Sequence, residues 1–435
     1  MYPTQTRLGS HVAEALLEKG YEVAGVVRPR SNLRNVAAFQ SKVTLVTAEL
    51  TDPWRVLRLL ESQRPDFIFH FAAQAFNSLS FEQPAETLHT NLMSTLHLLE
   101  AMRELKLKTT CLKSTKIIIA GSSTVYGAST EAYDGPVPEE APLQPVSPYG
   151  VSKAATEMLA LSYVRAHGLH VVVPRFFIHL APRGVESLAL HDFARQVAMV
   201  ERGLLSPPVL RHGDLSTRRD ITDIVDSAPV VVCLGEVAPS GTVVNLGSNV
   251  SYSMQHLLHE MVRLSPSWGE GLEQDVSRLR AYDERIVMAN ISKVQQLTGW
   301  VPRPNISLLL RMLLDYWRHE TAFRFPARSF GAREAVRFGG TRAVGRGSGP
   351  SWWNRMESID GGFSCMLQLM SRQTAEYRIL GTGFERAFKV NVFMVNSLGE
   401  EVVVTVVISV CSFLRTWQET NAAPRTREEE AMAEL

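Results

Sequence analysis

The chain has 435 residues, of which 45 are basic and 44 acidic, so its formal net charge is +1. A nearly neutral protein has no overall field that would attract nucleic acid or an anionic membrane, and we expect neither as a partner. The length allows a full hydrophobic core and more than one domain.

The cysteines give no sign of a metal site. They lie at Cys111, Cys233, Cys365 and Cys411, without the close spacing that metal ligands show. We therefore expect reduced thiols and a cytoplasmic location. No N-terminal stretch has the apolar core of a signal peptide, and no window reaches the roughly 18–20 apolar residues that a membrane-spanning helix needs.

The first predicted elements are a helix at residues 8–19 and a strand at 22–27. In a dinucleotide-binding unit, an apolar strand and a glycine-rich turn precede such a helix, because glycine lets the backbone approach the pyrophosphate at the helix N-terminus. Gly9 fits the last glycine of that turn, whereas Pro3 and Thr6 occupy the positions of the other two. We therefore expect the first strand to be absent and the phosphate site to be partial.

Two arginines directly after the 22–27 strand bear on the choice of cofactor. Arg28 and Arg30 stand where an NAD-binding fold carries an acidic residue for the ribose. A guanidinium suits a 2′-phosphate instead. The position favours NADP over NAD, and a solvated basic turn is the alternative.

Strand and helix patterns then alternate along the chain. Strands are predicted at 43–48, 66–71, 116–120 and 169–174, and helices after Asp52, near 83–104 and at 148–167. This order predicts an α/β fold with a Rossmann-like, doubly wound parallel sheet, which binds ligands at the carboxyl ends of its strands. Ala72, Ala73 and Gln74 lie at the carboxyl end of the 66–71 strand, where a cofactor has room to lie across the strand end.

The richest stretch for chemistry begins at the end of the 116–120 strand. Ser122 follows that strand, and Tyr149 and Lys153 stand four residues apart in the first turns of the 148–167 helix. This spacing puts the phenol and the ammonium on one face. A nearby cation lowers the pKa of a tyrosine from about 10, so we expect proton transfer near neutral pH. The serine hydroxyl would hydrogen-bond the reacting oxygen.

The motifs SSTVYG at 122–127 and SPYGVSK at 147–153 resemble the extended short-chain dehydrogenase/reductase family, whose NAD(P)-dependent members modify nucleotide-sugars. The stretch 138–317 is most similar to GDP-4-keto-6-deoxymannose reductases and then to GDP-mannose 4,6-dehydratases. The resemblance implies that Ser122 orients the sugar oxygen while Tyr149 transfers a proton. It further implies that Lys153 tunes the tyrosine and binds the nicotinamide ribose.

The same resemblance assigns further binding residues. Glu49 and Leu50 match the family position beside the adenine. His179, Arg219 and Arg280 match positions that contact the nucleotide-sugar, and arginine suits its diphosphate. Where the family has an asparagine, this chain has Ile178, which leaves a facing polar atom unpaired at a cost of about 1–3 kcal/mol.

The residue Thr124 distinguishes a 4,6-dehydratase from the other possible reactions. By resemblance, a 4,6-dehydratase uses a glutamate at this position to move a proton at C5 and eliminate water at C6, which threonine cannot do. The sequence favours an NADP-dependent reductase of a GDP-4-keto-6-deoxymannose-type sugar, with hydride transfer at C4. A dehydratase, a 4-epimerase and a catalytically impaired relative without the glycine turn are the alternatives. Because extended relatives often dimerise, a homodimer is expected.

The domain organisation follows from these patterns. We predict a dinucleotide-binding domain at 1–175, incomplete at its N-terminus, and a smaller α/β substrate-binding part of the same unit at 176–321. The stretch 322–362 is rich in arginine and glycine and is typical of a linker. Residues 363–435 form an unassigned C-terminal extension, whose apolar stretch at 402–414 is too short to span a bilayer and favours a strand.

Overall fold

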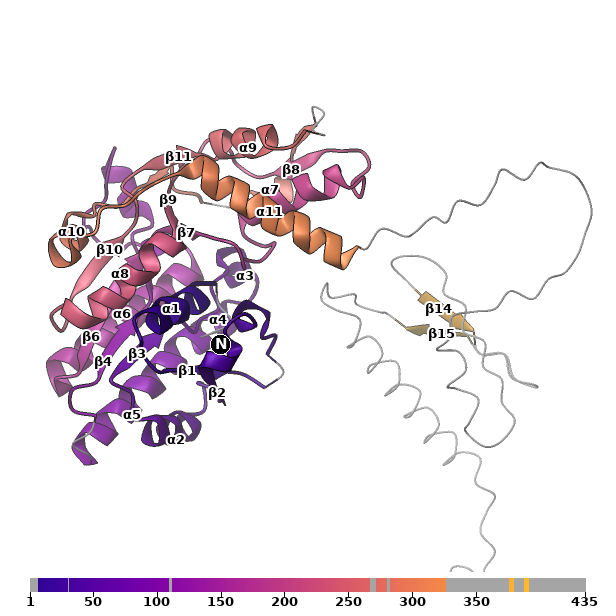
Figure 1. Cartoon of the computed structure of the whole chain (residues 1–435). Coiled ribbons are helices and arrows are strands. Elements are labelled where there is room, and N and C mark those ends of the chain that lie inside the picture. The colour runs from indigo at the N-terminus through magenta and orange to yellow at the C-terminus, as the bar shows by residue number, and fades with distance from the viewer. Residues whose placement is uncertain are drawn as a thin grey trace, which may run out of the picture. The chain divides into compact units, whose positions relative to one another are not determined.

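The computed structural model describes residues 7–29, 31–108, 112–266, 271–279 and 282–325, and the backbone of two short strands further on. The chain divides into two units, Met1–Ala332 and Arg333–Leu435 (Figure 1). In the second unit the described strands, β14 (Ala375–Arg378) and β15 (Ala387–Val390), pair antiparallel. Outside the described residues lie Pro3, Thr6, Arg30, Arg280, Cys111, Cys365, Cys411, most of 322–362 and the stretch 402–414.

The first half of the larger unit alternates strands and helices, as the sequence predicts. Its elements are α1 (Arg7–Glu18), β1 (Val23–Val27), η1 (Arg34–Val36), η2 (Gln40–Lys42), β2 (Val43–Thr47), α2 (Pro53–Gln63), β3 (Phe67–His70), α3 (Asn77–Glu82), α4 (Pro84–Leu88), the π-helix η3 (His89–Met93), α5 (Ser94–Lys108), β4 (Lys116–Ile119), β5 (Gly121–Ser122), η4 (Ser123–Val125), η5 (Ala128–Ala132), α6 (Pro148–His167) and β6 (His170–Phe176). The predicted helix near 83–104 is confirmed as one continuous helical run from Pro84 to Lys108, in which the π-helix η3 joins α4 to α5.

The strands form a parallel sheet with helices on both faces, which confirms the predicted fold class. The strand order is β10-β6-β4-β3, where β10 is Val243–Leu246, and β5 also pairs with β6. Ile118 packs in the cluster that includes residues of α1 and α8 (Ile224–Val237), whereas Ile117 and Ile119 pack in the cluster of α2, α5 and α6. Alternate residues of a strand buried on both faces belong to opposite layers, as in a doubly wound sheet.

The sheet is interrupted between β1 and β3. β1 pairs only with β2, as a separate two-stranded parallel sheet, and β3 pairs only with β4 among the described strands. A cavity of about 690 Å³ lies between them, lined by residues of both strands. Within the described part of the chain, no strand stands where the first strand of a dinucleotide-binding sheet belongs.

The second half builds a smaller region and also returns to the first. Its elements are β7 (Ile178–Leu180), α7 (Ala189–Glu201), β8 (Leu210–His212), β9 (Arg218–Asp223), α8, β10 (Val243–Leu246), β11 (Ser251–Ser253), α9 (Met254–Arg263), β12 (Leu272–Gln274), η6 (Val276–Arg278), β13 (Ile286–Val287), α10 (Ser292–Thr298) and α11 (Ile306–Arg324). Helices α7, α9 and α11 share their own core, whereas α8 and β10 complete the main sheet layer.

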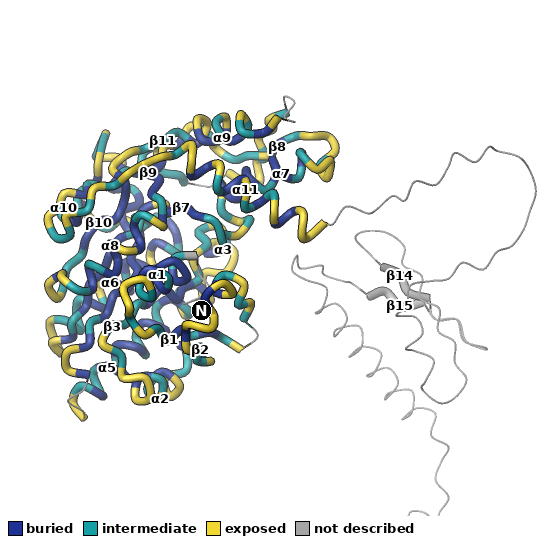
Figure 2. Tube along the Cα trace, in the orientation of Figure 1, coloured by how far each residue is buried: buried dark blue, intermediate teal, exposed yellow. Residues whose placement is uncertain are grey.

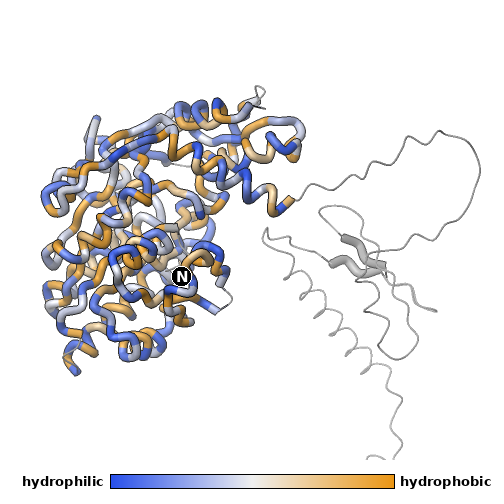
Figure 3. The backbone as a smooth tube through the Cα atoms, viewed as in Figure 1, coloured by the Kyte–Doolittle hydropathy of each residue, from blue (hydrophilic) through white to orange (hydrophobic). Residues whose placement is uncertain are grey.

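Burial follows this layering. Buried positions run through the strands and along the inward faces of the helices (Figure 2), and the hydrophobic residues follow the same path (Figure 3). No helix of the described residues is long and apolar enough to cross a membrane. The same residues contain no cluster of three histidine, cysteine or acidic side chains suited to a metal ion.

Candidate active site

The start of α6 fixes the position of Tyr149. Ser147 caps the helix, because its hydroxyl accepts a hydrogen bond from the Gly150 amide at 3.1 Å, and Pro148 occupies the first turn. A Cβ on Gly150 would lie 2.7 Å from the carbonyl oxygen of Thr124. The helix therefore packs directly on the loop that follows β5, which brings Tyr149 to the carboxyl end of the sheet.

Tyr149 is hydrogen-bonded to Ser122, as the sequence motif requires. Burial raises the pKa of Tyr149 to about 12, and the hydrogen bond to Ser122 acts in the opposite direction without cancelling it. The predicted lowering of the pKa is therefore not what this structure has. Desolvation of the phenol dominates, and the phenol is protonated at neutral pH.

Lys153 lies beneath the tyrosine ring. Its Nζ is 6.0 Å from the centre of the Tyr149 ring and donates a hydrogen bond to the Ala120 carbonyl at 2.8 Å. Only 6% of the lysine is exposed, and burial lowers its pKa to about 8. The ammonium is thus held between the phenol and the end of β4.

Thr124 orients the serine. The Ser122 hydroxyl oxygen accepts hydrogen bonds from the Thr124 amide at 3.3 Å and from the Thr124 hydroxyl at 2.9 Å. Because both contacts use the serine as acceptor, its own proton is left to point at Tyr149 or at a reacting oxygen. Threonine thus supports the serine here and carries no carboxylate.

Asn91 is a site residue that the sequence analysis missed. It lies in η3 and is 2% exposed. Its amide accepts from the Gln74 backbone N–H at 2.7 Å and donates to the Gln74 carbonyl at 3.1 Å and to the Ser152 hydroxyl at 2.9 Å. Asn91 therefore ties the turn after β3 to the catalytic helix. The sequence gives no distinct signal for it, because Asn91 stands among other polar residues such as His89, Thr90 and Ser94.

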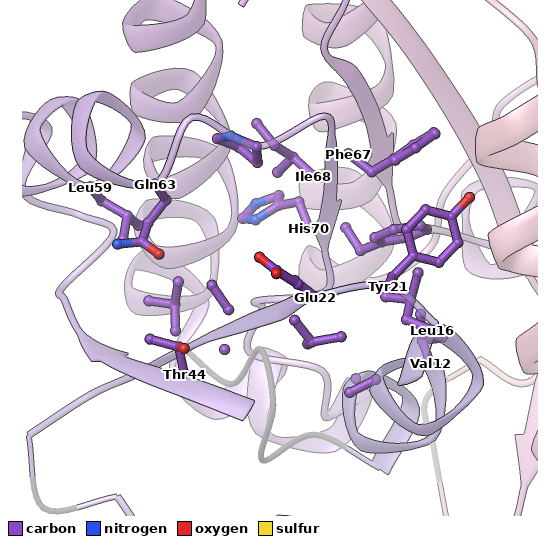
Figure 4. A pocket seen from close by; sticks show the side chains of 18 of the residues that line it. Val12, Leu16, Tyr21, Glu22, Thr44, Leu59, Gln63, Phe67, Ile68 and His70 are labelled. Atoms are coloured by element: carbon purple, nitrogen blue, oxygen red, sulfur yellow. The ribbon is translucent and has the colours of Figure 1, made fainter. Parts of the chain in front are cut away.

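His70 is the second residue that the sequence did not reveal. It ends β3, and its Nε2 lies 3.1 Å from the Thr95 hydroxyl. Burial, with help from the positive charge of Lys153, lowers the pKa of His70 to about 3. The imidazole is therefore neutral, and it connects the site to the cavity between β1 and β3, which it also lines (Figure 4).

A buried ion pair supports the catalytic helix from below. The Arg175 guanidinium on β6 donates to both oxygens of Glu157 on α6, at 2.9 and 2.6 Å. The same guanidinium donates to the Tyr126 hydroxyl at 2.7 Å and to the Glu139 carbonyl at 2.8 Å. Such a bidentate pair holds the helix in one rotational position relative to the sheet.

The candidate cofactor residues from Arg28 to Gln74 lie at the carboxyl ends of β1, β2 and β3, whereas Gly9 lies at the start of α1. Gly9 is buried in the first turn of α1, and Arg28 directly follows β1. After β2, Glu49 accepts a hydrogen bond from the Thr51 hydroxyl at 3.1 Å, and the Leu50 carbonyl contacts His97 Nδ1 at 3.2 Å. Ala72 and Ala73 after β3 are buried, and Gln74 is half-buried.

Two candidate substrate residues lie on neighbouring strands. β7, with His179, pairs in parallel with β9, which carries Arg219. His179 packs edge-on against Phe176 at 5.0 Å and contacts the Phe177 carbonyl through Nδ1 at 3.1 Å. Arg219 forms an ion pair with Asp283 and donates to the Glu284 carbonyl at 2.7 Å, so its guanidinium already has protein partners.

Comparisons with known proteins identify the family of this chain. The family described as GDP-mannose 4,6 dehydratase matches residues 7–313. GDP-6-deoxy-D-mannose reductase of Pseudomonas aeruginosa is 33% identical over 253 residues, which cover 58% of this chain and 80% of that protein. GDP-mannose 4,6 dehydratase 1 of Arabidopsis thaliana is 28% identical over 319 residues, which cover 71% and 86%.

Solved structures are also similar to this chain. RMD from Pseudomonas aeruginosa complexed with NADPH is similar with a TM-score of 0.60 and 28% identity, over 72% of this chain and 96% of that one. UDP-glucose 4-epimerase from Thermotoga maritima shares the fold, with a TM-score of 0.64 and 24% identity over 73% and 97%. The chain therefore belongs to the GDP-mannose 4,6-dehydratase family, within the extended short-chain dehydrogenases/reductases.

Proposed function

We propose that the protein is an NADPH-dependent reductase that acts on the 4-keto group of a GDP-4-keto-6-deoxymannose-type sugar. The observation that carries this proposal is the buried, hydrogen-bonded pair of Ser122 and Tyr149 beside Lys153, with Thr124 where a dehydratase needs a carboxylate. The relatives named above as a GDP-6-deoxy-D-mannose reductase and a GDP-mannose 4,6 dehydratase support a GDP-sugar as substrate.

The residues at the carboxyl edge fit the nicotinamide end of such a cofactor. Tyr149 and Lys153 face the end of β4, and the small buried side chains of Ala72 and Ala73 leave room across the end of β3. When bound, the cofactor would supply the hydride that reduces the C4 carbonyl carbon. Ser122 would donate a hydrogen bond to the carbonyl oxygen.

The protonation state of Tyr149 supports the reductive direction. Reduction of a ketone requires one proton at the oxygen, and a phenol with a pKa of about 12 carries that proton at neutral pH. The reverse reaction, with which a dehydratase or an epimerase begins, needs the phenolate. Lys153, whose pKa is about 8, lies close enough to stabilise the phenolate that remains after transfer.

NADP rather than NAD is the second part of the proposal. Arg28 directly follows β1, where an acidic residue would bind an unphosphorylated ribose. The NADPH complex of the Pseudomonas aeruginosa relative supports the same choice.

A homodimer is the third part. Extended relatives often pair through the helices that correspond to α5 and α6. The outer surfaces of these helices carry large apolar side chains, with Leu107 78% exposed, Met158 64% and Val151 44%. Sedimentation velocity should give a dimer that Met158→Glu converts to a monomer. A monomeric parent chain would contradict this part alone.

A dehydratase is the second candidate function, because the chain matches the GDP-mannose 4,6 dehydratase family. An analysis of the products distinguishes it from a reductase. The chain, with a strand and a glycine-rich turn added ahead of Arg7 to complete the phosphate site, is incubated with GDP-4-keto-6-deoxymannose and NADPH, or with GDP-mannose and NADP⁺, and the nucleotide-sugars are separated by chromatography. We expect reduction in the first mixture and no dehydration in the second. Dehydration of GDP-mannose would overturn the proposal in favour of the second candidate.

A further inference from the structure

The carboxylate of Asp220 is buried where the main sheet meets the smaller substrate region. Asp220 lies on β9 and is 1% exposed. Its Oδ1 accepts hydrogen bonds from the Ser248 amide and hydroxyl, both at 2.7 Å, and from the Thr222 hydroxyl at 3.3 Å. Its Oδ2 accepts from the amides of Asn249 at 2.9 Å and Ala289 at 3.1 Å. Each of these donors is neutral, so hydrogen bonds rather than a cation hold the buried carboxylate.

The loop after β10 approaches Asp220 closely in order to donate these bonds. A Cβ on Gly247 would lie 2.8 Å from Asp220 Oδ2 and 2.5 Å from the Ala289 Cβ, so glycine is required there. Asn249 has a φ of 59°, and this turn directs two successive amides at the same carboxylate. A positive φ costs energy in a residue other than glycine, and the hydrogen bonds to Asp220 offset that cost.

The contacts of Asp220 join two separate sheets. The loop that carries Ser248 follows β10, a strand of the main sheet, whereas β9 lies in the smaller sheet between β11 and β13 and also pairs with β7. The chain itself crosses between the sheets from β6 to β7, where the Phe177 amide donates to the Leu246 carbonyl at 3.0 Å. Without the carboxylate, β9 would lose its direct bonds to the loop after β10.

The residues next to this junction are those assigned to the substrate. Arg219 precedes Asp220 on β9, and His179 lies on β7 in the parallel ladder with β9. Ser122 of the candidate active site lies opposite Phe176 on β6, three residues before His179. A shift of β9 relative to β10 would therefore move Arg219 and His179 relative to Ser122.

We propose that Asp220 is a positioning residue for the nucleotide-sugar. Its carboxylate fixes β9 against the carboxyl edge of the main sheet, and so holds Arg219 and His179 in place relative to Ser122 and Tyr149. Asp220 acts through these residues and does not touch the substrate, because both of its oxygens are buried and hydrogen-bonded. The inference deepens the proposed function and rests on it for the substrate, a GDP-sugar, that Arg219 and His179 would contact.

Binding of GDP to the full chain tests this role. Asp220→Asn keeps the size of the side chain but places an N–H group where hydrogen-bond donors already converge, so the loop after β10 should separate from β9. Calorimetric titration at a temperature where both proteins are folded should give a Kd for GDP at least about tenfold higher in the variant. An unchanged Kd would overturn the inference.

Asp226→Asn is the matched control. Asp226 also accepts from N–H groups, those of the Trp300 ring at 3.2 Å and the Arg303 backbone at 3.3 Å, but it lies on α8, away from the loop after β10. This variant should bind GDP as the parent chain does. A loss as large as that in Asp220→Asn would show that the effect is not specific to β9 and would overturn the inference.

Turnover separates positioning from a direct part in the chemistry. In the chain with the added strand and glycine-rich turn, Asp220→Asn should raise KM for the GDP-sugar and leave kcat nearly unchanged, because Ser122, Tyr149 and Lys153 lie on other elements. A decrease in kcat at an unchanged KM would contradict the positioning role.

Amide hydrogen exchange tests the same role without a ligand. Asp220→Asn should speed exchange in 178–180 and 218–223 by at least about tenfold and leave 116–119 in β4 unchanged. Equal acceleration in all three segments would indicate a general loss of stability and would overturn the inference. If Asp220→Asn does not fold, Ser248→Ala removes one hydroxyl donor, keeps the backbone amides, and should speed exchange in the same two segments to a smaller extent.

These readouts also distinguish the inference from the proposed function. A parent chain that binds no GDP would contradict the proposed substrate, and the exchange pattern would still decide the role of Asp220. Conversely, normal GDP binding with an unchanged Kd and unchanged exchange in Asp220→Asn would overturn the inference and leave the proposed function standing.

Discussion

Glu157 on α6 and Arg175 on β6 form a bidentate ion pair directly beneath the candidate active site, with hydrogen bonds of 2.9 and 2.6 Å. Glu157 stands four residues after Lys153 and eight after Tyr149, so all three share one face of the helix. The pair thereby couples the orientation of the catalytic side chains to the sheet.

Glu157→Gln should strongly destabilise the protein. The substitution leaves the Arg175 guanidinium buried without its counter-charge, which costs about 3–5 kcal/mol in unfolding free energy. Urea denaturation measures the loss. The control is Glu104→Gln, which removes the exposed pair with Lys108 and should cost less than about 1 kcal/mol. Similar losses in the two variants would mean that the Arg175 pair is not anchored as described.

Lys153 should make stability increase with pH in an alkaline window. Its pKa is lowered from 10.5 to about 8 in the folded protein, so between these values the unfolded chain binds more protons. The unfolding free energy therefore increases as pH rises from about 8 toward 10.5, by up to about 1.4 kcal/mol per pH unit. Denaturation of the parent chain and of Lys153→Met across this window measures the effect. A parallel pH dependence of the two proteins would contradict the assignment.

Local signals explain which elements the sequence could predict. The helix at 148–167 is confirmed at both ends, because Ser147, Pro148 and the left-handed Gly168 are short-range start and stop signals. The π-helical stretch inside the helix near 83–104 could not be predicted, because its Asn91 is hydrogen-bonded to Gln74 and Ser152, which are distant in sequence. No local pattern contains that contact.

The same distinction between local signals and contacts that depend on the whole fold applies to the candidate active site. The spacing of Tyr149 and Lys153 and the serine at the strand end could be predicted, because motif and helical geometry are local. The direction of the Tyr149 pKa shift could not be predicted, because it depends on how completely the folded protein excludes water from the phenol. The assigned roles of Glu49, His179 and Arg219 stay predictions, while Arg30 and Arg280 lie outside the described residues.

Adding a strand and a glycine-rich turn directly ahead of Arg7 should increase NADPH affinity. The graft would fill the space between β1 and β3 and present glycine amides at the N-terminus of α1, where the helix dipole favours phosphate. We expect at least about a hundredfold decrease in Kd, or roughly 2.7 kcal/mol. Fluorescence titration of the parent and grafted chains measures it, and a folded graft that binds no better would refute the expectation.

Arg28→Ala in the grafted chain should abolish the preference for NADPH over NADH. The loss of a charge-assisted bond to the 2′-phosphate should weaken NADPH binding by about tenfold or more and leave NADH binding nearly unchanged. Arg58→Ala, an exposed arginine on α2, is the matched control. Equal affinities for the two cofactors before the substitution would already contradict NADP specificity.

The central claim is that Tyr149 donates the proton in the reduction of a GDP-4-keto-6-deoxy sugar. Its most direct test is NADPH oxidation, followed by absorbance, in the grafted chain with GDP-4-keto-6-deoxymannose, with and without Tyr149→Phe. The account predicts turnover in the grafted chain and a decrease of about 10²–10⁴-fold in kcat for Tyr149→Phe, with NADPH affinity little changed. Undiminished turnover in Tyr149→Phe, or none in a grafted chain that binds both NADPH and the sugar, would contradict it.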